Sequence, residues 1–75
     1  MKSALPNGTV LVDYAEEGSM LGVGVVLKSY DGRENEFCQI IWLWHKNADF
    51  EGTREVWSIR AIYCDPNILI MGSEP

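Results

Sequence analysis

Basic side chains are scarce in this chain. Six lysines and arginines stand against eleven aspartates and glutamates, which gives a formal net charge of −5 over 75 residues. Because binding to a phosphate backbone draws on clustered lysine and arginine, nucleic acid is not the expected partner. No apolar run approaches the roughly 20 residues that a membrane-spanning helix needs, and the segment from Met1 to Asn7 has no apolar stretch of the secretory kind. We therefore expect a cytoplasmic protein with no membrane partner.

Cysteine and histidine are equally sparse. The two cysteines, Cys38 and Cys64, are too few for a disulfide scaffold. In the cytosol we expect both to be reduced, half-buried thiols, with a bridge open to them only if their strands are neighbours. The lone histidine, His45, shares a loop with Asp49 and Glu51, but one histidine with scattered carboxylates is not the ligand set of a zinc site. The sequence predicts no metal and no other cofactor.

Catalytic constellations are also missing. Nucleophilic catalysis needs a cysteine or serine beside a base that a third group orients. Cys38 and His45 would lie roughly 20 Å apart along a straight strand, although Cys64 with His45 stays geometrically open. Gly22 and Gly24 lack the following helix of a phosphate-binding glycine loop. We predict that the protein is not an enzyme.

Helical periodicity is nearly absent, because no stretch carries apolar residues at i, i+3, i+4 and i+7 for three turns. Runs of β-branched and aromatic residues alternate with turn residues instead, and they predict short strands. The expected strands are Thr9–Tyr14, Leu21–Tyr30, Glu36–Trp44, Arg54–Ile59 and Ile68–Met71, with Arg60–Cys64 continuing the alternation. The sequence thus predicts an all-β protein, a small, strongly bent five-stranded barrel. One domain covers residues 1–75, with an ordered core over about 8–71 and a frayed tail at 72–75.

The third predicted strand is apolar on both of its faces. Strict alternation places Phe37, Gln39, Ile41 and Leu43 on one face, and Cys38, Ile40, Trp42 and Trp44 on the other. One core in a 75-residue protein cannot cover both faces. Either the strand is central in a barrel with a covered outside, or its outer face meets another molecule.

The large aromatic side chains also indicate a surface that meets another molecule. The chain has three tryptophans, three tyrosines and two phenylalanines, more than so small a core accommodates. Aromatic residues are enriched at binding hot spots because they bury a large area with little loss of entropy. We predict a partner-binding surface of Trp42, Trp44, Phe50 and Tyr63, with Trp44 and Phe50 as anchors. The expected partner is a second copy of the chain, in a homo-oligomer, or another protein.

Three segments resemble parts of SH3-like barrels. Gly22–Leu27 and Ile40–Trp42 are similar to the second and third strands of that fold, and Trp57–Ile62 is similar to the segment that closes it. The resemblance implies an SH3-like barrel. Small phage and marine-viral proteins of similar length share the pattern, which implies a structural or accessory role in the host cytoplasm or the virion.

Two segments resemble the signatures of Sm-like RNA-binding barrels. Leu27–Asn35 is similar to the first signature and Ile59–Ala61 to the second, although Arg33 stands where the family has a base-stacking aromatic residue. This resemblance implies an alternative function, an oligomeric ring that binds single-stranded RNA through Arg33, Asn35 and Arg60. Nucleic acid is a partner only under this alternative.

Overall fold

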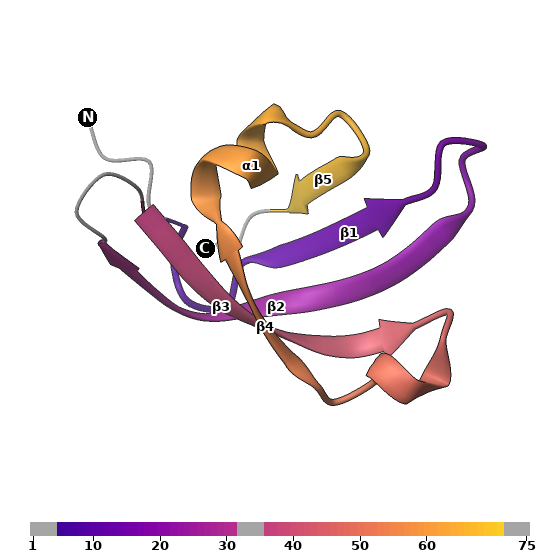
Figure 1. The fold of residues 1–75 in the computed structure, drawn as a ribbon, viewed down its shortest axis with the longest axis horizontal. Helices are drawn as coiled ribbons and strands as arrows, with labels where there is room; N and C mark the ends of the chain where they lie inside the picture. The colour runs from indigo at the N-terminus through magenta and orange to yellow at the C-terminus, as the bar shows by residue number, and fades with distance from the viewer. Residues whose placement is uncertain (1–4, 32–35, 72–75) are drawn as a thin grey trace.

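Five antiparallel strands form one sheet (Figure 1). The structure, a computed structural model, describes residues 5–31 and 36–71; the tail predicted at 72–75 lies outside this part. The strands are β1 (Val10–Tyr14), β2 (Met20–Asp31), β3 (Glu36–His45), β4 (Arg54–Ser58) and β5 (Ile68–Met71). Their order across the sheet is β4-β3-β2-β1-β5. The predominantly β fold and the five strands are confirmed.

The sheet is not closed. In the described residues β4 and β5 are its two edges and do not pair with each other. A short helix, α1 (Ile59–Cys64), connects them across the concave side of the bent sheet (Figure 1). The structure is therefore an open, strongly bent sheet with a helical connection between its edges.

The prediction of strand for Arg60–Cys64 is wrong, because these residues belong to α1. Ser58 caps the helix by accepting a hydrogen bond from the backbone N–H of Ala61 at 3.3 Å. Ile59 and Ile62, one helical turn apart, are both buried in the core. A helix of six residues is too short to produce the three-turn periodicity that identifies helices in a sequence.

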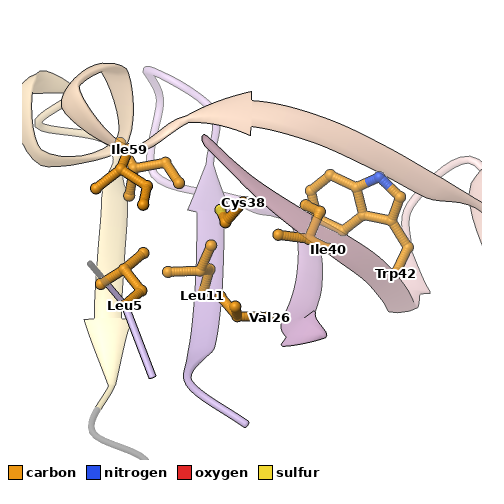
Figure 2. Packing of buried hydrophobic residues seen from close by; sticks show 8 residues of the cluster. Leu5, Leu11, Val26, Cys38, Ile40, Trp42 and Ile59 are labelled. Atoms are coloured by element: carbon orange, nitrogen blue, oxygen red, sulfur yellow. The ribbon is translucent and has the colours of Figure 1, made fainter. Parts of the chain in front are cut away.

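The core lies between the concave face of the sheet and α1 (Figure 2). Its buried members come from the segment before β1, from β1, β2 and β3, and from α1: Leu5, Leu11, Val26, Cys38, Ile40, Trp42, Ile59 and Ile62. The segment before β1 is held in place by the hydroxyl of Ser29, which donates to the Leu5 carbonyl at 2.7 Å. Cys38 is buried in this core, Cys64 is exposed on α1, and both are free thiols. The expectation that both are half-buried is therefore wrong.

A bulge in β3 changes which face its last residues occupy. Trp42 pairs with Gly24 and Trp44 pairs with the adjacent Val23, so Leu43 is an extra residue without a partner in the register. The extra residue shifts the alternation by one. Trp42 therefore faces the core while Trp44 faces outward, and their predicted placement on one face is wrong.

The concave face of β2 is shaped by glycine. A Cβ atom added at Gly22 would lie 2.7 Å from Cζ3 of Trp42 and 2.8 Å from Cδ2 of His45. Real Cβ atoms essentially never approach that closely. The absence of a side chain at Gly22 lets both rings pack directly on the backbone of β2, which explains why a glycine occupies this position inside the strand.

None of the helices in the described part of the chain is long and apolar enough to cross a membrane.

The Gly22→Ala variant tests this packing. Because the added methyl would overlap the Trp42 ring, we expect a loss of about 1–3 kcal/mol in the free energy of unfolding, measured by urea denaturation. Gly24→Ala is the matched control, since its added Cβ would meet its nearest neighbour, Cδ1 of Ile40, at 3.3 Å and should cost less. Equal losses in the two variants would contradict the proposed contact.

Candidate interaction surface

The side of the sheet that faces away from the core is covered by apolar side chains. Cross-strand partners in an antiparallel sheet point to the same face, so the strand register identifies them. One row runs Met71, Val10, Val25, Ile41 and ends at Arg54 of β4, and the next runs Leu69, Val12, Val23, Trp44. We call the eight apolar residues of these two rows the outer sheet face. They come from β5, β1, β2 and β3, and the exposed Arg54 borders them.

Three of the eight residues of the outer sheet face are exposed, and the others are half-buried or, at Val12, buried. Trp44 is 40% exposed, Leu69 49% and Met71 48%. Val12, in contrast, is only 6% exposed although it does not belong to the core cluster.

Polar residues border the apolar rows. Beyond Ile41, the next row across the strands pairs Lys28 with Gln39 and Gln39 with Val56. The lysine is exposed and the glutamine is half-buried. An apolar centre with a polar rim is the usual anatomy of a protein–protein interface.

A different network occupies the concave side of β3 and β4. Glu55 accepts hydrogen bonds from two indole N–H groups, that of Trp57 at 2.7 Å and that of Trp42 at 3.1 Å. The two indoles meet edge to face with ring centroids 5.7 Å apart. Trp42 also meets His45 at 4.9 Å, and His45 meets Phe50 at 4.8 Å. We call these five residues the inner-rim network.

Phe50 is positioned by the loop between β3 and β4. A short 3-10 helix, η1 (Ala48–Phe50), begins where the side chain of Asn47 accepts from the backbone N–H of Asp49 at 3.0 Å. The loop then returns to β3, because the Gly52 N–H donates to the Trp42 carbonyl at 2.8 Å. This geometry carries Phe50 onto His45 and leaves the phenylalanine 42% exposed.

Asp13 lies beside the inner-rim network. Asp13 pairs with Gly22, and Gly22 pairs with His45, so all three share one row on the concave face. Burial raises the pKa of the Asp13 carboxyl, and the nearby carboxylates of Asp65 and Glu55 raise it further. His45 and the backbone N–H of Tyr14 act in the opposite direction.

The four predicted partner-binding residues do not form one surface. Trp42 and Phe50 both belong to the inner-rim network, where each contacts His45, whereas Trp44 is on the outer sheet face. Trp42 is only 3% exposed and belongs to the core. Tyr63 is 53% exposed on α1. Of the four, Trp44 is the residue that lies within a continuous apolar surface.

The residues of the RNA-binding alternative are only partly described. Arg60 is exposed on α1, while Arg33 and Asn35 lie outside the described residues. Within residues 5–31 and 36–71, no three histidine, cysteine, aspartate or glutamate side chains are placed to hold a metal ion.

The aliphatic members of the outer sheet face were not predicted from the sequence, in which the aromatic residues are the more conspicuous signal. Aliphatic residues of β1, β2 and β5 contribute more of its members than tryptophan does. The signal was present in β2, where Val23 and Val25 fill the positions between the buried residues Gly22, Gly24 and Val26. A strand that is apolar at every position has two faces to cover.

The Glu55→Gln variant tests the inner-rim network. Glutamine offers one carbonyl oxygen where the carboxylate offers two, so one indole N–H loses its acceptor. We expect a loss of about 1–3 kcal/mol in the free energy of unfolding, measured by urea denaturation with tryptophan fluorescence. Glu51→Gln, an exposed change in the loop, is the control and should have no effect. A fully stable Glu55→Gln variant would contradict the two-acceptor arrangement.

The Asp13→Asn variant tests the electrostatics of the same region. Because the pKa of Asp13 is raised in the folded protein, its ionisation opposes folding above that pKa. We expect the variant to be more stable than the wild type at pH 7. The difference should shrink as the pH falls through the raised pKa and below the ordinary value of 3.8, because the carboxyl then becomes protonated in both states. Glu16→Gln, in the exposed turn between β1 and β2, is the control, and thermal unfolding at several pH values is the measurement. A destabilised Asp13→Asn variant at pH 7 would show that the carboxylate is favourable there.

Comparison of the chain with protein-family models, curated proteins and solved structures found no match. The resemblances to SH3-like and Sm-like barrels therefore rest on the short motifs that carry them.

Proposed function

We propose that this protein is a non-catalytic protein-interaction module that acts through its outer sheet face, by binding a second copy of itself or another protein. The observation that carries the proposal is the row of apolar side chains on the side of the sheet that the core does not use. Monomeric proteins rarely expose a large contiguous apolar patch unless it is used for binding.

The size of the chain strengthens the argument. A domain this small buries a modest fraction of its surface on folding, and its stability is correspondingly marginal. Burying the exposed parts of Trp44, Leu69 and Met71 against a partner removes apolar area from water at about 25 cal/mol per Å². Part of this gain is lost to the ordering of side chains. A partner that covers the outer sheet face therefore supports both the assembly and the fold.

The architecture proposed here is a small barrel-like module of the SH3-like kind. The single antiparallel sheet, its strong bend and the single core beneath it are compatible with that resemblance. The helix α1 lies between the two edges of the sheet, where a closed barrel would have paired strands. The phage or viral accessory role implied by the resemblance remains part of this proposal.

Replacing an apolar residue of the outer sheet face by glutamate tests the proposed function. We expect Leu69→Glu and Trp44→Glu to reduce self-association, because a charge in the centre of an apolar contact loses its hydration without finding a partner. Light scattering coupled to gel filtration measures the mass, and circular dichroism verifies that each variant is folded. Both residues are about half exposed, so neither change creates a cavity in the core.

Ala61→Glu is the matched control for this experiment. It introduces the same charge at an exposed position on α1, away from the outer sheet face, and should leave the mass unchanged. A wild type that is monomeric at micromolar concentration excludes self-association at useful affinity. Binding to another protein would then have to be shown with an identified partner and lost in Leu69→Glu.

A further inference from the structure

The strand β4 presents an unpaired edge. In the described residues it is hydrogen-bonded to β3 on one side and to no strand on the other. An exposed edge is a template for another strand, and natural proteins protect it by keeping it short or with charged residues, proline or a bulge. β4 is short and carries Arg54 and the inward-pointing Glu55, but it has no lysine, proline or bulge, and its central residue, Val56, is 55% exposed.

Side-chain hydrogen bonds and regular pairing with β3 hold β4 in an extended conformation. Glu55 and Trp57 point to the concave side, where the carboxylate accepts from the indole N–H groups of Trp57 and Trp42. Five consecutive residues of β4 are in register with β3, and no register shift is recorded between these strands. A rigid edge loses little conformational entropy when a second strand is added, which favours strand addition as a binding mode.

We propose that β4 pairs antiparallel with β4 of a second copy, so that Val56 faces Val56 across a two-fold axis perpendicular to the sheet. The inference rests on the proposed function for the idea of self-association and adds the surface and its geometry. Such a contact is isologous and closes after two copies. The two sheets become one continuous sheet whose outer faces lie side by side.

The chemistry of β4 selects this register over its alternatives. With Val56 at the centre, Arg54 lies opposite Ser58 and Glu55 lies opposite Trp57, and all of β4 (Arg54–Ser58) takes part. Centring the pair on Glu55 would place two carboxylates opposite each other, which destabilises a strand pair. Centring it on Trp57 would leave only the end of β4 paired, because the chain enters α1 at Ile59. A register centred between two neighbouring residues would place residues that point to the concave side opposite residues that point outward.

A charge-exchange experiment at Val56 tests the proposal directly. In Val56→Lys or Val56→Glu two like charges would face each other across the axis, and we expect dimerisation to weaken roughly tenfold or more in each variant. An equimolar mixture of the two variants places opposite charges across the axis, and we expect it to recover the dimer. Val56→Thr, which keeps a β-branched side chain without charge, is the control and should stay dimeric. Sedimentation velocity over a range of concentrations measures the mass, and circular dichroism verifies the fold.

The outcomes distinguish pairing through the β4 edge from association through the outer sheet face. Weak dimers in both charged variants with recovery in the mixture support edge pairing at Val56. A dimer that survives Val56→Lys but is lost in Leu69→Glu overturns edge pairing and leaves the outer sheet face as the contact. Loss of the dimer in both charged variants without recovery in the mixture overturns the two-fold register. A wild type that is monomeric throughout overturns self-association by either surface.

Discussion

Much of the molecule depends on the Trp42 indole packing directly on the backbone of β2 at Gly22. Because the glycine has no side chain, the ring reaches the space between the sheet and α1 while staying close to the strand. From that position its N–H meets Glu55, and its edge meets Trp57 and His45. The contact between Trp42 and Gly22 therefore connects β2, β3 and β4. It also positions the indole against which His45 packs, and His45 in turn contacts Phe50.

The same contact has a consequence for the opposite side of the sheet. β3 must turn Trp42 inward and still continue to the end of β2, and the bulge at Leu43 allows this by shifting the alternation of the residues that follow. Trp44 consequently joins the outer sheet face instead of the core. The concave side is already filled by Trp42, Ile40 and the residues of α1. On the outer sheet face Trp44, Leu69 and Met71 stay exposed, at 40%, 49% and 48%.

The strands could be predicted from the sequence because their signals are local. β-branched runs bounded by turn residues fix where β3, β4 and β5 begin, and the observed bounds lie close to those expected. The helix α1 could not be predicted, because Ser58 as a cap and two buried isoleucines leave no periodic pattern over so few residues. The separation of Trp44 from Trp42 also escaped prediction, since a bulge is set by the register of two strands and not by the sequence of one. Phe50 and Trp44 were correctly placed at the surface, yet their assignment to opposite sides of the sheet depends on the same bulge.

The three tryptophans lie in three different environments. Trp42 is enclosed in the core, Trp57 is half-buried with its indole N–H held by a carboxylate, and Trp44 is open on the outer sheet face. A collisional quencher such as iodide reaches the open indole far more readily than the enclosed one. The intrinsic emission of the chain therefore contains a component that reports on Trp44, and shielding of that component shows without any label when another molecule covers the convex side.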